Sequence, residues 1–415
     1  MYPTMFRIPF LPEWLADIKS YGVMMMIAFL TGIWLACRRA YRSQANPDVV
    51  LNMGFIALVC GVAGSRAMFV IHYWGERFAN QPHPIMAIFD IRAGGLEFWG
   101  GPLLVIPTLA IYLRFIAKTS ARWYLDITLP SLAWGLAITR IGCFLNGCCW
   151  GSMCVNEHDP VRQQAAIPWA VQFPYGSPAM VQQYKFGELP LPKELILSAG
   201  DGVENYPLPK EYIDAAVKDG GKTRQRLQSQ LNDASKAYDD LVKSNADAEI
   251  LKQAQARVDA ARKARQGYAA GPMGLVEDQC RKYGLTVPQL AEFASYYRSK
   301  PVHPAQLYDT INGLLLAWVL STIFYYRKRH GVILGWFLIL YSISRIFTEL
   351  IRSDNPLDVF GLTISQAISA CTLAAGLLWM WLIYTRLPMV SPRVAPYIPP
   401  EDEKEATPVA RKARQ

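Results

Sequence analysis

Residues 125–150 read LDITLPSLAWGLAITRIGCFLNGCCW, a stretch that is apolar over most of its length. A helix of about 20 mostly apolar residues crosses a hydrocarbon core about 30 Å thick. The stretch also carries Arg140, and an ionisable residue at such a depth usually marks a functional position. This one segment therefore predicts a membrane-spanning helix with a polar site inside it.

Six further apolar stretches reach a similar length. They explain why 52% of the residues are hydrophobic and only 18% are charged. We therefore predict an all-α integral membrane protein with about seven transmembrane helices. The other predicted spans are residues 21–37, 53–74, 98–117, 307–326, 332–351 and 362–384.

Basic residues set the predicted orientation, because Lys and Arg near the ends of spans are held in the cytoplasm. Basic residues follow the first, third, fifth and seventh spans, at 38–42, 114–122, 327–329 and 386. The N-terminus is therefore expected outside and the C-terminus in the cytoplasm. These clusters also account for much of the net charge of +9, so no nucleic-acid partner is expected.

Composition divides the chain into four parts. A helical hairpin is predicted at about 210–266, because leucines recur there at helical spacing, with a turn near 244–247. The four parts are a membrane domain with four spans at 1–150, an extracytoplasmic insertion with this hairpin at 151–302, a membrane domain with three spans at 303–386, and a disordered cytoplasmic tail at 387–415.

Ionisable residues within or beside the spans are the first candidates for a functional site. Arg345 and Glu349 are four residues apart on one helical face and are predicted to form an ion pair, for which a purely structural role is the alternative. Several arginines with few neighbouring carboxylates favour an anionic ligand, because guanidinium groups bind phosphate bidentately. A phospholipid headgroup is the nearest phosphate, and helix anchoring at the interface is the alternative role. The candidates are Arg66, Glu97, Arg140, His303, Arg345 and Glu349.

Four cysteines gather at the outer end of the fourth span. A disulfide, with Cys280 as a further partner, and a zinc site are the two interpretations of this cluster. Tetrahedral zinc sites usually use better separated ligand pairs, so we expect no metal. The four are Cys143, Cys148, Cys149 and Cys154.

Six short motifs in the two membrane-embedded parts are distinctive as a set. They are Ser20-Tyr21-Gly22, Gly64-Ser65-Arg66, GGLEFWGG at 94–101, RIGCFLNG at 140–147, HPAQLY at 303–308 and SRIFTELIR at 344–352. In this order they resemble the motifs of the prolipoprotein diacylglyceryl transferase family of bacterial inner membranes. Each motif alone has little specificity, whereas six in register are a strong indication.

The resemblance implies transfer of the diacylglyceryl group from phosphatidylglycerol to the lipobox cysteine of a preprolipoprotein. The products are a thioether and glycerol phosphate, and the step is the first in bacterial lipoprotein maturation. The implied partners are phosphatidylglycerol, a preprolipoprotein lipobox peptide and membrane lipids, and no cofactor is required. A non-enzymatic phospholipid-binding or scaffold paralogue is the alternative. A transporter is disfavoured, because the sequence has no pair of matching halves with interrupted helices.

The resemblance also assigns site residues on the matched motifs. Arg140 and Arg345 are expected to stabilise the charge that develops on the leaving phosphate. Glu97, His303 and Glu349 are three candidates for the base that activates the acceptor thiol. The catalytic set is Arg140, Arg345, Glu349, His303, Glu97 and Tyr21, and the phosphatidylglycerol-binding set is Arg140, Arg345, Arg66, Asn146, Gln306 and Tyr308.

Three positions depart from the family pattern. Trp99 stands where the family usually has a histidine, and tryptophan cannot accept a proton. Cys143 and Cys148 stand where asparagine and glutamate are common. The insertion is also longer and more helical than the small outer domain of the family. The non-enzymatic alternative depends on these departures.

Overall fold

A computed structural model of the chain describes residues 4–7, 17–79, 84–89, 94–155, 165–197, 205–244, 247–352, 363–394 and 397. Contacts within the chain divide it into two compact units. Residues 2–145 and 305–415 form the first, which we call the membrane unit. Residues 146–304 form the second, which we call the insertion.

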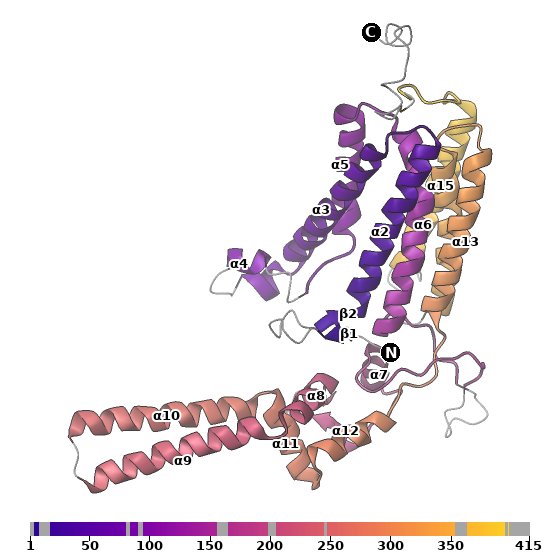
Figure 1. The fold of residues 1–415 in the computed structure, drawn as a ribbon. Helices are drawn as coiled ribbons and strands as arrows, with labels where there is room; N and C mark the ends of the chain where they lie inside the picture. The colour runs from indigo at the N-terminus through magenta and orange to yellow at the C-terminus, as the bar shows by residue number, and fades with distance from the viewer. Residues whose placement is uncertain are drawn as a thin grey trace. The chain divides into compact units, whose positions relative to one another are not determined.

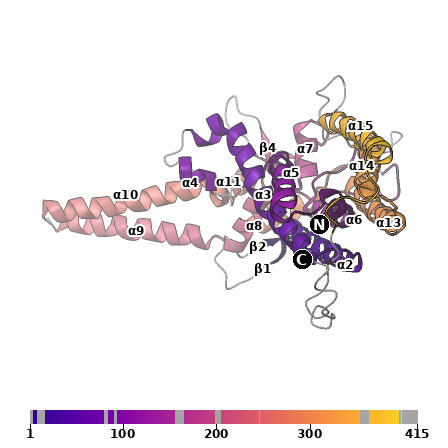
Figure 2. The ribbon, with the colours of Figure 1, turned by 90° about the horizontal axis from the view of Figure 1, so that it is seen from above.

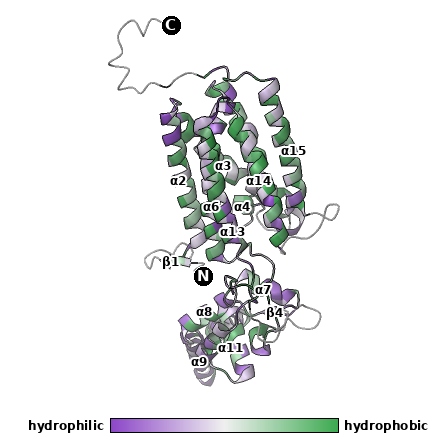
Figure 3. Ribbon diagram, turned by 90° about the vertical axis from the view of Figure 1, so that its right-hand side faces the viewer, coloured by the Kyte–Doolittle hydropathy of each residue, from purple (hydrophilic) through white to green (hydrophobic). Residues whose placement is uncertain are grey.

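Seven apolar helices dominate the described part of the membrane unit, and each coincides with one predicted span (Figure 1). Six are long and apolar enough to cross a membrane, and the seventh, α5 with its continuation η2, is shorter. Their hydrophobic residues stand out in Figure 3. The predicted all-α membrane architecture is therefore confirmed. The helices are α2 (Ser20–Arg42), α3 (Pro47–His72), α5 (Gly100–Ile111) with η2 (Tyr112–Ile116), α6 (Ala121–Asn146), α13 (Ala305–Tyr326), α14 (Val332–Ile351) and α15 (Ile364–Thr385).

These helices form two groups (Figure 2). α13, α14 and α15 pack in sequence order with α6 beside them, while α3 pairs with α5 and also contacts α2. A buried core joins α2, α3, η2, α6, α13 and α14, and it includes Ala40, Leu113, Ile127, Leu320 and Ile333. The smaller elements of this unit are the antiparallel strands β1 (Thr4–Arg7) and β2 (Asp17–Lys19), the π-helical η1 (Trp74–Phe78) and the short helix α4 (Pro84–Phe89).

α5 begins two residues later than predicted, because Phe98 and Trp99 form the turn that precedes it. Its first residue, Gly100, lies directly against Gly64 of α3, so that a Cβ on either residue would overlap the carbonyl oxygen of the other. Helix backbones approach this closely only where both residues lack a side chain. The glycines therefore fix the crossing of α3 and α5.

α6 also ends before the predicted limit. It stops at Asn146 instead of Trp150, because Gly147 has φ +76°, in the left-handed region that ends helices. Near this end, a Cβ on Gly142 would lie 3.3 Å from the Cδ2 atom of Tyr21. The first turn of α2 therefore packs closely on the last turns of α6.

Asp126 of α6 is fully buried and binds the start of α14. Its carboxylate accepts hydrogen bonds from the N–H groups of Gly331 (2.7 Å) and Ile333 (3.1 Å), and the Nε atom of Arg327 lies 3.0 Å from it. The first N–H groups of a helix have no partner within the helix, so a carboxylate there satisfies them. Asp126 thus joins α6 to the loop between α13 and α14.

Residues 387–394, the first part of the predicted disordered tail, contact the same loop. The N–H of His330 donates to the carbonyl of Met389 (3.0 Å), and the N–H of Ser391 donates to Nδ1 of His330 (3.3 Å). Burial, followed by the positive charges of Arg327 and Arg122, lowers the pKa of His330 to about 4, so its ring is neutral and can accept this bond. Apart from Tyr397, the remainder of the predicted tail lies outside the described residues, and its disorder stays a prediction.

The insertion has its own hydrophobic core. Strands at its two ends pair, since Val171 and Val302 exchange hydrogen bonds of 3.0 and 3.1 Å. Further along, Leu195, Leu208, Ile213 and Leu290 are buried together. The elements are α7 (Pro178–Lys185), η3 (Lys193–Leu195), β3 (Ile196–Leu197), β4 (Tyr206–Pro207), α8 (Lys210–Asp219), α9 (Lys222–Lys243), α10 (Ala248–Ala270), α11 (Pro272–Tyr283) and α12 (Val287–Tyr296).

α9 and α10 pack against each other as a two-helix arm (Figure 1). α9 ends at Lys243 and α10 begins at Ala248, on either side of the predicted turn. The helix predicted from residue 210 is interrupted, because Gly220 and Gly221 have φ +57° and +76° and separate α8 from α9. α8 belongs to the core of the insertion, whereas α9 has no buried residue.

We predict that Gly100→Ala lowers the free energy of unfolding by about 1–3 kcal/mol, the usual cost of overpacking. The added methyl group meets the carbonyl oxygen of Gly64, and α3 and α5 must move apart. Thermal unfolding of the purified protein in detergent measures the change. Gly22→Ala is the matched control, since a Cβ there has no neighbour within 4 Å. Equal midpoints for the two variants would contradict the proposed crossing.

We also predict that Asp126→Asn costs about 3 kcal/mol, because it leaves the charge of Arg327 without its carboxylate. Asp48→Asn serves as the control: Asp48 is exposed in the first turn of α3, where a charge contributes roughly 0.5 kcal/mol. The same unfolding assay compares them. A loss no larger than that of the control would show that Asp126 is not needed to hold α14.

Candidate active site

Polar side chains from four helices meet inside the membrane unit. They come from the last third of α6, the first turns of α13, the last two turns of α14 and the start of α15. Because α6 and α14 run in the same direction and α13 and α15 run in the opposite one, these segments lie at one end of the bundle (Figures 1 and 3).

Arg140 of α6 is paired with Asp309 of α13. The Nε atom of Arg140 lies 3.2 Å from Oδ2 of Asp309, and the two side chains are 26% and 11% exposed. A partly buried guanidinium is strongly stabilised by an adjacent carboxylate. Asp309 therefore offsets part of the cost of burying the charge of Arg140 at this depth.

Arg345 and Glu349 form the ion pair that their spacing predicted, with 2.8 Å between Nη2 and Oε2. The second carboxylate oxygen accepts a hydrogen bond from the hydroxyl of Thr363 (2.9 Å), which caps the N-terminus of α15. Nη2 of Arg345 also donates to the hydroxyl of Ser365 (3.1 Å). These contacts join α14 to α15 and fix the orientation of the guanidinium.

A cavity of about 40 Å³ lies between the two ion pairs. Nη1 of Arg345 is buried and has no hydrogen-bond partner among the described residues. Unpaired buried donors of this kind usually face a water molecule or a ligand. The volume suffices for about three water molecules. The side chains with polar groups that line it are Arg140, Asp309, Asn312, Tyr341, Ser344, Arg345 and Thr348.

Arg66 has a different environment from the other two arginines. Its guanidinium donates to the carbonyl oxygens of Ala87 (2.8 Å), Ile88 (2.7 Å), Gly94 (2.9 Å) and Gly95 (2.9 Å), and the residue is 8% exposed. These bonds fasten the segment between α3 and α5 to α3. Its assignment to phosphatidylglycerol stays a prediction beside this structural role.

Glu97 follows the Gly94–Gly95 turn and pairs with a histidine that the sequence had not singled out. Oε2 of Glu97 lies 3.2 Å from Nδ1 of His72, at the end of α3. Trp99, two residues on, is 45% exposed. His72 is one of only five histidines and lies inside the predicted span 53–74, so the rule that ionisable groups in spans mark functional positions also selects it.

The remaining predicted residues fall in both units. In the membrane unit, Tyr21 packs on α6 beside Gly142, and Gln306 is fully buried in the first turn of α13. Tyr308, two residues on, is half-buried. Asn146 and His303 belong to the insertion. The functional roles of all these residues stay predictions.

The backbone of His303 lies at the paired base of the insertion. Its carbonyl accepts a hydrogen bond from the N–H of Gly151 (2.9 Å), and its own N–H donates to the carbonyl of Ser152 (3.0 Å). Cys154 and Cys280 are both buried free thiols, so the disulfide interpretation does not hold for these two. Burial raises the pKa of both thiols, which makes them poor nucleophiles.

The arginines of the site are less isolated than the sequence indicated. Glu349 is the partner that the sequence predicted for Arg345, whereas Asp309, the partner of Arg140, was not predicted. Asp309 and Asp126 both lie inside predicted spans. Arg140 was selected because ionisable groups in spans mark important positions. The same rule also selects these two aspartates.

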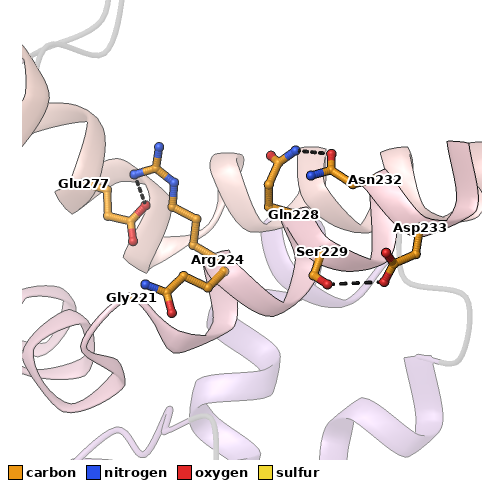
Figure 4. A pocket seen from close by; sticks show the side chains of 8 residues that line it. Gly221, Arg224, Gln228, Ser229, Asn232, Asp233 and Glu277 are labelled. Carbon is orange, nitrogen blue, oxygen red and sulfur yellow. Dashed lines mark hydrogen bonds and ion pairs between the residues drawn. The ribbon is translucent and has the colours of Figure 1, made fainter. Parts of the chain in front are cut away.

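A larger hollow of about 540 Å³ lies on the arm of the insertion (Figure 4). Nη1 of Arg224 lies 3.4 Å from Oε2 of Glu277, and the side-chain amide of Gln228 donates a hydrogen bond to Asn232 (2.8 Å). Ser229 similarly donates to an aspartate one turn later. The polar side chains that line the hollow thus bind one another.

Membrane-spanning helices with paired arginines and carboxylates between them define a multi-pass membrane protein with a polar intramembrane site. The family model of prolipoprotein diacylglyceryl transferase matches residues 6–207 and 256–382. The chain therefore belongs to the prolipoprotein diacylglyceryl transferase family, as its six motifs indicated. The match omits residues 208–255, which hold α8, α9 and the start of α10.

Individual relatives agree with the family assignment. A phosphatidylglycerol–prolipoprotein diacylglyceryl transferase of Rhodopirellula baltica is 26% identical over 399 residues, which cover 88% of this chain and 72% of that protein. Proteins of the same name from Nitratidesulfovibrio vulgaris and Vibrio cholerae are 34% and 32% identical over 39% of this chain. The chain spans 56% and 55% of the length of these two relatives.

We predict that the Arg140–Asp309 pair contributes a coupling energy of about 1–3 kcal/mol to stability. Each of Arg140→Gln and Asp309→Asn leaves one charge unpaired, whereas the double variant removes both charges. The double variant should therefore unfold at a higher temperature than the sum of the single effects predicts. Strictly additive losses in thermal midpoint would show that the two side chains do not interact.

Proposed function

We propose that the chain transfers the diacylglyceryl group of phosphatidylglycerol to the lipobox cysteine thiol of a preprolipoprotein in the bacterial inner membrane. The reaction forms a thioether and releases glycerol phosphate. The observation that carries the proposal is the pair of membrane-embedded arginines, Arg140 and Arg345, on either side of one small polar cavity in a chain of this family.

The arginine pair suits a phosphate leaving group. As the bond between the glyceryl carbon and the phosphate oxygen breaks, negative charge accumulates on the phosphate, and fixed donors stabilise that charge most effectively in a site with little water. A guanidinium has five N–H donors, so one that is bound to a carboxylate and a hydroxyl through a single nitrogen can still donate from the other. In Arg345 the donor without a partner among the described residues is Nη1.

The ion pairs give the arginines their orientation before substrate arrives. Glu349 and Ser365 hold one side of Arg345, and Asp309 holds Nε of Arg140. The donors are therefore positioned without reorganisation during the reaction. A cavity of about 40 Å³ does not enclose a phospholipid headgroup, so substrate binding requires the side chains around it to separate.

Transfer of a labelled diacylglyceryl group from phosphatidylglycerol to a lipobox peptide by the purified full chain tests the proposal. We expect label on the peptide, none on a peptide with serine in place of cysteine, and a loss of about 100-fold or more for Arg140→Ala and for Arg345→Ala. Arg114→Ala is the matched control, because Arg114 is exposed in η2.

Two results would contradict the proposal. Folded protein that binds phosphatidylglycerol but transfers nothing would identify a non-enzymatic lipid-binding paralogue. Full transfer by both site variants would place phosphate stabilisation on other residues.

A further inference from the structure

A histidine–glutamate pair lies outside the arginine network, where α3 meets the turn before α5. Nδ1 of His72 is 3.2 Å from Oε2 and 3.4 Å from Oε1 of Glu97. The imidazole is 61% exposed, the carboxylate is 26% exposed, and the ring stacks on Tyr73 with 4.7 Å between centroids. Nε2 makes no hydrogen bond within the described part of the chain, so one ring nitrogen is held and the other is open.

The turn that carries Glu97 is fastened to α3. Arg66 donates to the carbonyl oxygens of Gly94 and Gly95, both at 2.9 Å, and the N–H of Glu97 donates to the carbonyl of Ser65 (3.0 Å). Gly94 and Gly95 have φ +80° and +87°, a conformation that side chains disfavour. A carboxylate held by such a turn keeps its position relative to the end of α3.

This arrangement gives the imidazole a defined protonation pattern. An ionised carboxylate only accepts hydrogen bonds, so the proton of the neutral ring lies on Nδ1 and Nε2 is the acceptor. A proton gained by Nε2 leaves the contact between Nδ1 and Glu97 in place, because both nitrogens of a protonated ring are donors. Nε2 of His72 is therefore an accessible proton acceptor, while Nδ1 is held by Glu97.

Groups in the arginine network and in the turn before α5 are less suited than His72 to accept a proton. Glu349 is 3% exposed, and its carboxylate is bound by Arg345 and Thr363. Trp99 follows the same turn as Glu97 but has only a donor on its ring. In contrast, the open nitrogen of His72 needs no prior rupture of an ion pair.

We propose that His72, oriented by Glu97, is the catalytic base that removes the proton from the acceptor thiol. This inference rests on the proposed function. α3 ends at the same end of the membrane unit as α6 and α14, which carry the two arginines (Figures 1 and 3). The lipobox thiol has to be deprotonated before it attacks, because the thiolate is the nucleophile.

Nε2 of His72 takes the thiol proton, and the thiolate sulfur forms a bond with the glyceryl carbon. The bond between that carbon and the phosphate oxygen breaks, and its electron pair leaves with glycerol phosphate, whose charge Arg140 and Arg345 stabilise. The imidazolium then releases its proton to the departing phosphate or to water, which restores the neutral ring.

The test compares two acceptors, a lipobox peptide with cysteine and the same peptide with selenocysteine, under reducing conditions. A selenol is a stronger acid than a thiol and is ionised at neutral pH, so it needs no base. Purified full chain transfers labelled diacylglyceryl from phosphatidylglycerol vesicles to each peptide. We expect His72→Ala to reduce transfer to the cysteine peptide about 100-fold, and transfer to the selenocysteine peptide by less than about 10-fold.

Glu97→Gln tests the positioning residue. It should reduce transfer to cysteine less than His72→Ala does, and it should show the same recovery with selenocysteine. Ile71→Ala is the matched control for local disturbance, because Ile71 precedes His72 and is 73% exposed. It should transfer to both peptides at the rate of the unchanged protein.

The remaining outcomes overturn the inference in distinguishable ways. Loss of transfer to both peptides in His72→Ala would assign the histidine a structural or lipid-binding role. Unchanged transfer to cysteine would show that another group is the base. If the unchanged protein transfers to neither peptide, the proposed function fails as well, whereas the first two outcomes leave it intact.

Discussion

A charged side chain in hydrocarbon is stable only beside an opposite charge or several hydrogen-bond partners, and the packing of the membrane unit follows from this constraint. Arg140 and Asp309 join α6 to α13, and Arg345 and Glu349 join α14 to α15. At the other end of the bundle, Asp126 joins α6 to the start of α14. The same contacts that satisfy charge also determine which helices are neighbours.

This constraint gives the site its chemical character. Because both arginines are paired with carboxylates, they remain in place without a ligand. Nη1 of Arg345, which has no hydrogen-bond partner among the described residues, can still donate to an anion. Carboxylates so close to the cavity would repel a phosphate if the arginines did not outweigh them locally. In the proposed function, the two arginines of these stabilising ion pairs are also the groups that bind the phosphate.

Much of the fold could be predicted from the sequence, because long apolar runs and basic flanks are local properties. The helices lie where those runs lie, and the arm turns where its apolar spacing breaks. The partners of charged residues could not be predicted in the same way. Asp309 is far from Arg140 in the chain, and the four carbonyl oxygens around Arg66 belong to a turn whose shape depends on Gly94 and Gly95. The α3–α5 crossing equally needed three-dimensional information, since a glycine pattern alone does not say which glycines meet.

The arm of the insertion differs from the rest of the chain in how its helices are held. α9 has no buried residue and α10 has only Ala254 and Val258, so the two helices depend mainly on a narrow seam with each other. Local opening of such a segment requires far less free energy than unfolding of a packed core. Amide hydrogens in α9 should therefore exchange with solvent long before those of Leu195 or Leu290. By the same reasoning, the arm can change in length or unfold without disturbing the core of the insertion.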